Sequence, residues 1–283
     1  MNQKNLDYLQ AQVKYTGFGE GLESQLAEQI KSGAMTFSLT HQAFYGKDEA
    51  VATLHFKKSS QDNYFFNSYD LAVKQEGMQV PLKQSFFLGY DNNFTLKEAY
   101  NLLSGRSVYK ELAKLIDDGN GRLEAKGEKY HAWVKLDFGD KDKNDNYKEK
   151  RYHQNWGFDL DAVLSKLPIK ELADPKEKER LIASLQKGNV HAVTFAIAGN
   201  EVRRYIEAVP QFRSINQYNA DMERVGFRRS AKEATAQSES QQVVQKADDP
   251  GPPKVTAAKQ DPQQKSPPRQ KVAKARKKGL SPG

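Results

Sequence analysis

Aromatic and basic side chains are concentrated in residues 129–156, which the sequence predicts to be a β-hairpin. Residues 130–138 alternate between apolar and polar positions, and residues 147–156 supply the return strand. The face that this pattern turns away from the core, together with the return strand, carries His131, Trp133, Lys135, Lys148, Lys150, Arg151, Tyr152 and Trp156. Rings stack on bases and cations neutralise phosphates, so this surface is predicted to bind nucleic acid. An amphipathic edge hairpin or a protein-contact surface is the alternative interpretation.

A second group of cations consists of Lys271, Lys274, Arg276, Lys277 and Lys278. It belongs to the segment 230–283, which contains no Phe, Tyr, Trp or Ile, a single Leu and seven of the eleven prolines. Such a segment buries too little apolar surface to offset the roughly 1–2 kcal/mol of backbone entropy lost per ordered residue. We therefore expect a disordered basic tail that is attracted to a phosphate backbone. A solubilising linker is the alternative.

The net charge of +8 comes mostly from this tail. Residues 230–283 contain eleven basic and five acidic residues, a net charge of +6, whereas residues 1–229 contain 33 basic and 31 acidic residues. The first residues lack the apolar region of a secretory signal, and the longest mostly apolar stretch, 190–198, is too short to span a membrane. The absence of cysteine excludes disulfides, cysteine–zinc sites and cysteine nucleophiles. We expect a soluble cytoplasmic protein without membrane association.

No catalytic, cofactor-binding or metal-ligating residue is predicted, and no cofactor is implied. The glycine-rich segment 17–21 lacks the spacing of a dinucleotide-binding loop and follows a predicted helix, which favours a helix–helix turn. The segment 140–151 begins like a calcium-binding loop, but Asp145 and Arg151 stand where glycine and glutamate are needed. No serine lies in a nucleophile motif.

Among the five histidines, only His131 and His153 are predicted to meet. They lie on the two strands of the 129–156 hairpin and face each other if the paired residue numbers sum to 284. Two histidines without a nearby carboxylate make a poor metal site. We interpret them as cross-strand surface partners.

Hydrophobic periodicity predicts an α+β fold with antiparallel sheets and interleaved helix pairs. In the first half, apolar spacings of three and four predict two short helices within 6–30, and alternation predicts strands around 52–56, 64–69 and 78–88. A capping box, Thr95 to Glu98, opens a helical region whose inward residues extend to Leu115, with a break near Gly105.

In the second half, Asp159 and Asp174 are predicted to cap two helices, and a hairpin around residues 199–200 leads to a last extended segment, 212–218. The polar, glycine-rich stretch 117–127 marks a subdomain boundary. The predicted organisation is a helical hairpin (1–34), a first α+β subdomain (35–120), a second α+β subdomain (121–229) and the disordered basic tail (230–283).

Five segments carry a resemblance to a known family: 52–58 (ATLHFKK), 63–69 (NYFFNSY), 98–106 (EAYNLLSGR), 133–138 (WVKLDF) and 210–216 (PQFRSIN). Over residues 5–229 the chain resembles an uncharacterised protein family encoded on integrative and conjugative elements of anaerobic gut bacteria. The resemblance brings no established activity and no site residues. It implies a genomic setting beside DNA-transfer functions, and by association a nucleic-acid partner.

Three hypotheses follow. The first is a non-enzymatic accessory protein of a mobile genetic element that binds nucleic acid, or a protein of the DNA-transfer machinery, with the basic tail assisting. The second is a protein–protein adaptor or inhibitor acting on a host or conjugation protein. The third is an enzyme of unknown class, which a deep pocket with convergent titratable groups would favour. The oligomeric state stays open.

Overall fold

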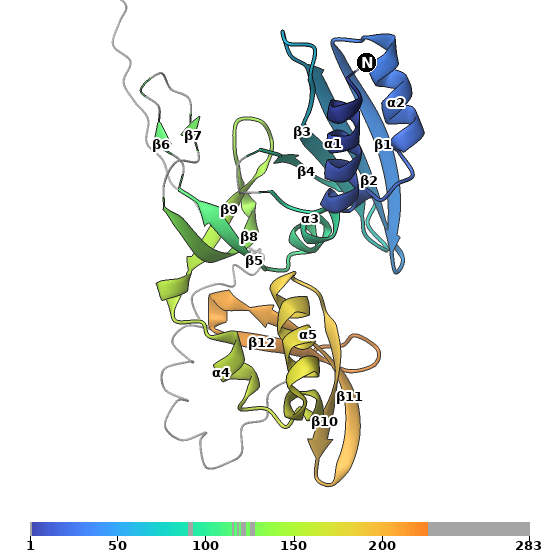
Figure 1. Cartoon of the computed structure of the whole chain (residues 1–283). Coiled ribbons are helices and arrows are strands. Elements are labelled where there is room, and N and C mark those ends of the chain that lie inside the picture. Colours follow the sequence, from blue (N-terminus) through green and yellow to red (C-terminus); the bar gives the residue numbers. More distant parts are fainter. Residues whose placement is uncertain are drawn as a thin grey trace, which may run out of the picture. The chain divides into compact units, whose positions relative to one another are not determined.

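The computed structural model describes residues 2–89, 93–114, 116–117, 119, 123–124 and 128–225. These residues form five α-helices and three antiparallel sheets of three or four strands, in the orders β1-β2-β3-β4, β5-β8-β9 and β10-β11-β12 (Figure 1). Two short strands, β6 (Ile116–Asp117) and β7 (Leu123–Glu124), also pair with each other. Strands in blocks alternate with helices and every described pairing is antiparallel, so the predicted α+β class is confirmed.

The first sheet buries one face beneath the N-terminal helix pair. Its strands are β1 (Thr36–Tyr45), β2 (Asp48–Lys58), β3 (Tyr64–Lys74) and β4 (Leu82–Phe87). Two helices, α1 (Gln3–Val13) and α2 (Glu23–Ser32), cover it as the apolar spacing predicts (Figure 1). Phe18, in the turn between them, is 1% exposed and packs edge-on against the rings of Phe66 and Tyr69. The glycine-rich segment is therefore a helix–helix connection anchored in the core.

Helix α3 (Leu96–Leu103) begins with the predicted capping box. The Glu98 amide donates to Thr95 Oγ1, and the Thr95 amide donates to the Glu98 carboxylate at 2.9 Å. Asn101 in this helix is fully buried, and its Nδ2 donates to the Lys187 carbonyl (2.6 Å) and to Asn189 Oδ1 (2.9 Å). Because these acceptors follow helix α5 (Pro175–Gln186), a buried polar contact fixes α3 against that helix.

The helical prediction after Gly105 is wrong. Gly105 adopts a φ of +79°, and the chain continues as strand β5 (Val108–Ala113). Val108 and Leu112 are both buried, as expected from the sequence, but a spacing of four places two residues on one face of a strand as well as of a helix. The spacing alone could not distinguish the two structures.

The middle sheet consists of β5, β8 (Lys129–Lys141) and β9 (Tyr147–His153), and both of its faces contribute to a core. One face supplies Val134 and Leu136 to the core of the first sheet, whereas the other supplies Trp133 and Tyr152 to a second core. Strands β5 and β8, on the two sides of the predicted subdomain boundary at residue 120, are paired strands of one sheet. The described residues up to Val225 belong to one compact unit.

The third sheet consists of β10 (His191–Ile197), β11 (Asn200–Val209) and β12 (Ser214–Tyr218). Helices α4 (Leu160–Leu164) and α5 (Pro175–Gln186) pack on one of its faces (Figure 1). Both helices begin as predicted, since Asp159 Oδ1 accepts from the Ala162 amide and Asp174 Oδ1 accepts from the Lys176 amide. Val193, Phe195, Ile206, Ala208 and Ile215 form the buried face.

Among the described residues, no helix has both the length and the apolar character needed to cross a membrane. The predicted tail 230–283 lies outside the described residues.

Candidate nucleic-acid interface

The aromatic centre of the predicted hairpin interface is closed. Trp133 is 5% exposed and Tyr152 is 9% exposed. The Trp133 ring lies 5.2 Å from Tyr109 and 5.4 Å from Phe158, which leads into α4. The face that the sequence predicts to be open is therefore the wall of the second core. Trp133 and Tyr152 cannot stack on bases, and this part of the prediction is wrong.

The lysines of the hairpin lie on the same face, beyond the buried rings. Lys150 contacts the Asp137 carboxylate at 2.7 Å and Lys148 contacts Asp140 at 3.0 Å. The hydrogen bond from Lys150 lowers the pKa of Asp137, and Asp137 in turn raises the pKa of Lys150. Lys135 stands opposite Lys150 in the strand register. Two of these three cations are thus paired with carboxylates, which weakens the positive field expected of a phosphate-binding surface.

Arg151 is on the opposite face of the hairpin, because it pairs with Val134 in the register. Its guanidinium donates to the Glu149 carboxylate at 2.7 Å and to the Tyr130 hydroxyl at 2.9 Å. The predicted set of cations is therefore divided between two faces.

His131 and His153 do not meet. The observed register pairs His153 with Ala132, one residue away from the predicted partner. A shift of one residue moves a side chain to the other face of a strand. His153 stacks on Tyr130 at 5.1 Å, whereas His131 lies 3.8 Å from the Glu111 carboxylate. The prediction of cross-strand partners is wrong.

Trp156, another residue of the predicted interface, has an accessible ring, with 42% of its surface exposed. Its Nε1 donates to the Pro210 carbonyl at 3.0 Å, and the Arg213 guanidinium lies 5.2 Å from the ring centre. The Trp156 ring therefore already has a cationic neighbour in Arg213. The predicted cations of the tail, Lys271, Lys274, Arg276, Lys277 and Lys278, lie outside the described residues.

An aromatic and basic surface does exist on the open face of the third sheet. Strand alternation places Tyr205 on the face opposite the buried Ile206, and the β11–β12 register sets Tyr205 directly opposite Tyr218. Both tyrosines are partly buried. Directly opposed residues in an antiparallel pair have Cβ atoms about 4.5–5.5 Å apart, so the two side chains are neighbours on this face.

Two arginines flank the tyrosine pair. Arg203, two residues from Tyr205 and therefore on the same face, holds its guanidinium 5.9 Å from the Tyr205 ring centre. Arg224 forms an isolated antiparallel bridge with Tyr218, which places it on the far side of the pair. Both arginine side chains are exposed. Two arginines and two tyrosines thus lie together on the open face. We call Arg203, Tyr205, Tyr218 and Arg224 the tyrosine–arginine face.

A hydrogen-bonded group fixes Tyr218 on this face. Its hydroxyl donates to Glu207 Oε1 at 2.6 Å, and Asn216 Nδ2 donates to the same oxygen at 2.7 Å. Partial burial and the hydrogen bond to Glu207 raise the pKa of Tyr218 to about 12. The phenol therefore stays neutral at physiological pH and adds no charge that would repel phosphate.

The sequence contains a signal for this face. Arg203 and Tyr205 occupy alternate positions of a predicted strand, and Tyr218 ends the next strand. Pairing of the two tyrosines depends on the β11–β12 register, which the turn at Pro210–Phe212 sets. Without that register the residues could not be assembled into one surface.

A serine, a histidine and a carboxylate meet on the open face of the first sheet. Ser38 Oγ lies 3.0 Å from His55 Nδ1, and His55 Nε2 lies 2.8 Å from Asp70 Oδ2. This connectivity is that of an activated nucleophile, but catalysis also needs oxyanion donors and a cavity for the substrate. The three residues lie on neighbouring strands of an exposed sheet face, and the His55 and Asp70 side chains are 39% and 53% exposed. The arrangement serves as a cross-strand polar network.

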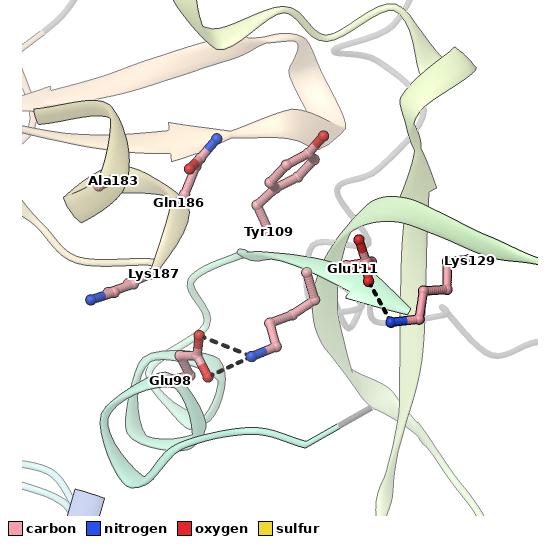
Figure 2. Close-up of a pocket in the computed structure, with 8 residues that line it drawn as sticks. Glu98, Tyr109, Glu111, Lys129, Ala183, Gln186 and Lys187 are labelled. Carbon is pink, nitrogen blue, oxygen red and sulfur yellow. Dashed lines mark hydrogen bonds and ion pairs between the residues drawn. The ribbon is translucent and has the colours of Figure 1, made fainter. Parts of the chain in front are cut away.

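A pocket of about 370 Å³ lies between α3, β5, β8 and α5 (Figure 2). Glu98 contacts Lys110 at 3.1 Å, and Glu111 contacts Lys129 at 2.9 Å, as the dashed lines in Figure 2 show. Glu98 also closes the capping box of α3. Both carboxylates of the pocket are therefore engaged in ion pairs that join elements of the fold, and neither is poised to act as a general base.

No protein-family model matches the chain, and neither a curated protein nor a solved structure matches it.

Proposed function

We propose that this chain is a non-enzymatic, cytoplasmic accessory protein of a mobile genetic element that binds single-stranded nucleic acid on the tyrosine–arginine face. The observation that carries the proposal is the direct opposition of Tyr205 and Tyr218 on an open sheet face, with Arg203 and Arg224 beside them. The family resemblance of the sequence agrees with a partner in DNA transfer.

Stacking supports a single-stranded ligand. Aromatic side chains on a sheet surface stack with unpaired bases, and each stacked base contributes about 1–3 kcal/mol. Bases within a duplex are already stacked and their flat faces are inaccessible. The flanking arginines supply the charge that tracks a phosphate backbone, and Glu207 is an acidic residue whose carboxylate is occupied by Tyr218 and Asn216.

The predicted basic tail supports the same ligand. Arg224 lies on the tyrosine–arginine face, and the chain reaches the tail, with its net charge of +6, within six residues. A tethered cationic segment raises the effective concentration of a polyanion near the face. It adds attraction that is independent of sequence and sensitive to salt.

The test is fluorescence anisotropy with labelled single-stranded DNA, RNA of matched sequence and duplex DNA, titrated against salt. The full chain should prefer the single strands. The double variant Tyr205→Ala/Tyr218→Ala should lose about 1–3 kcal/mol of binding free energy per removed ring. The variant Tyr205→Phe/Tyr218→Phe keeps both rings and should retain most of the affinity.

The matched control is Tyr8→Ala/Tyr15→Ala, which removes two exposed tyrosines of the N-terminal helices, at 61% and 79% exposure, and should leave binding unchanged. A 1–229 truncation should keep the single-strand preference with lower affinity and a smaller salt slope. Absence of binding by the full chain at low salt would refute the proposal. Full affinity of a folded Tyr205→Ala/Tyr218→Ala protein would place the site elsewhere.

A further inference from the structure

Strand β1 is a long, uncharged edge. It forms one margin of the first sheet (Figure 1), and its ten residues, Thr36–Tyr45 (TFSLTHQAFY), include no Asp, Glu, Lys, Arg or Pro. Its pairing with β2 is continuous over all ten positions, without a bulge. Within the described part of the chain, no backbone group pairs with its outer side. Charges, prolines, bulges and short length are the usual means by which an edge avoids pairing, and β1 has none of them.

Three other outer edges are covered by the chain itself. Along β4, the Ser85 amide donates to Asn146 Oδ1 at 2.9 Å and the Gln84 side chain bonds to the Tyr147 backbone at 2.8 and 3.2 Å. Along β10, the Thr194 amide donates to the Glu171 carboxylate and the Ala196 amide donates to the Pro168 carbonyl. Along β12, the Val225 amide donates to the Gln217 carbonyl. These contacts occupy groups that would otherwise accept a foreign strand.

The remaining edges of three-stranded sheets carry charges. Strand β9 contains four consecutive charged residues, 148–151, and the short strand β5 contains Lys110 and Glu111. Of the outer edges in the described ranges that belong to these three sheets, β1 therefore stands apart, because it is both uncovered and uncharged. An edge left in this state at full length indicates a strand partner.

We propose that β1 pairs antiparallel with β1 of a second copy of this chain, around a two-fold axis near its middle. Such a pairing would join two four-stranded sheets into one of eight strands. A two-fold axis brings the residues beside it near their own symmetry mates, so a charge in the middle of the strand would face a like charge. The uncharged composition of β1 fits a second copy for this reason.

The side chains of β1 also suit self-pairing on both faces. Ser38, Thr40 and Gln42 share the open face, where hydroxyl and amide groups can hydrogen-bond across the new strand pair. Phe37 and Leu39 lie on the core face and would extend the apolar layer. The inference is independent of the proposed nucleic-acid site, because it uses no residue of the tyrosine–arginine face.

Light scattering coupled to size-exclusion chromatography, over a wide concentration range, tests the proposal on the full chain. The wild-type chain should be a dimer, and Thr40→Lys should be a monomer because two lysines then meet near the axis. The matched control is Thr53→Lys, which places the same charge opposite Thr40 on β2 and should leave the dimer intact. A monomeric wild type, an unaffected Thr40→Lys dimer, or equal loss in both variants would overturn the proposal.

Cysteine crosslinking gives a second test that does not require disruption of the fold. The chain has no cysteine, so a single introduced thiol can crosslink only to its own mate. Opposed residues of an antiparallel pair lie about 4.5–5.5 Å apart at Cα, within the range of a disulfide. Under mild oxidation at least one of Ser38→Cys, Thr40→Cys and Gln42→Cys should give a covalent dimer.

The control for crosslinking is Phe87→Cys, which is on the same open face but on β4, at the other margin of the sheet; Phe87 is 69% exposed. It should not crosslink. Failure of all three β1 positions, or equal crosslinking at position 87, would overturn the two-fold arrangement even if the chain were dimeric.

Discussion

The first and third sheets each bury one face beneath helices and expose the other, and the two exposed faces differ in chemistry. The first exposes hydroxyl groups and the Ser38–His55–Asp70 network beside an uncovered edge. The third exposes the tyrosine–arginine face, and its edges are covered. The fold determines which face is open, whereas the residues on that face determine the class of partner. The proposed partner is a second copy for the first sheet and a polynucleotide for the third.

The middle sheet differs from the other two because both of its faces are buried, and substitution of Trp133 tests this difference. Trp133→Ala should lower the free energy of unfolding by about 3–5 kcal/mol, because it empties a buried site between Tyr109 and Phe158. Trp156→Ala should cost about 1 kcal/mol, since it removes one hydrogen bond from a ring that is 42% exposed. Urea unfolding measures both. A stable Trp133→Ala protein that had lost nucleic-acid binding would restore the hairpin as the interface.

Charge removal on the two open faces separates them further. Arg203→Gln should lower the affinity for single-stranded DNA and reduce the slope of log K against log salt by about 0.7, the value for one phosphate contact on a single strand. Lys83→Gln removes a cation from the open face of the first sheet, because Lys83 alternates with the buried Gln84 along β4. This variant should change neither the affinity nor the salt slope. Equal effects of the two variants would indicate attraction to the whole protein surface without a defined site.

Removal of an acidic side chain should change the stability of the protein when the residue lies on the first sheet, and the nucleic-acid affinity when it lies on the third. Asp70→Asn takes the charged acceptor from His55 and Ser85, so the free energy of unfolding should fall by about 0.5–1.5 kcal/mol. Glu207→Gln keeps an oxygen acceptor for Tyr218 but removes a negative charge beside the rings, and should raise nucleic-acid affinity a few-fold. Urea unfolding and anisotropy on both variants check the two expectations. Loss of binding in a folded Glu207→Gln protein would contradict the stacking arrangement.

Local signals in the sequence predicted much of the fold. The caps at Thr95, Asp159 and Asp174 act within one turn, so residue type and spacing were sufficient. Strand β1 was not predicted, although Phe37, Leu39 and later apolar residues alternate along it. A signal was present, because Gly46, with a φ of +65°, lies in the two-residue turn that joins β1 to β2, and such a turn is typical of a hairpin.

The sequence could not predict that the second face of β8 is buried, because the segments that cover this face are distant in the chain. Alternation correctly divided β8 into two faces, but Phe158 and the α4 residues cover Trp133 from outside the hairpin. The register of β8 and β9 also shifts between Asp137 and Lys141, so the pairing beside the turn does not determine which residue faces His153. Neither effect is encoded in the spacing of residues within the hairpin itself.

The smallest expected effect is the pH dependence of the free energy of unfolding. The first and third sheets each contribute one half-buried histidine to it. Burial lowers the pKa of His41 on β1 and the pKa of His191 on β10 below the ordinary value of 6.5, and Glu171 and Glu177 partly oppose the shift at His191. The unfolded chain therefore binds more protons just below pH 6.5, so stability is complete above that pH and falls as the pH drops through the folded-state values. Solvent screening keeps the loss small.

Urea midpoints from pH 7.5 to 5 should decline less in His41→Gln and in His191→Gln than in the wild type. His41→Gln alone could flatten the plot of urea midpoint against pH, and only at protein concentrations where the chain is dimeric. That result would assign the acid sensitivity to the β1 edge, and the first and third sheets would then differ in acid sensitivity as well.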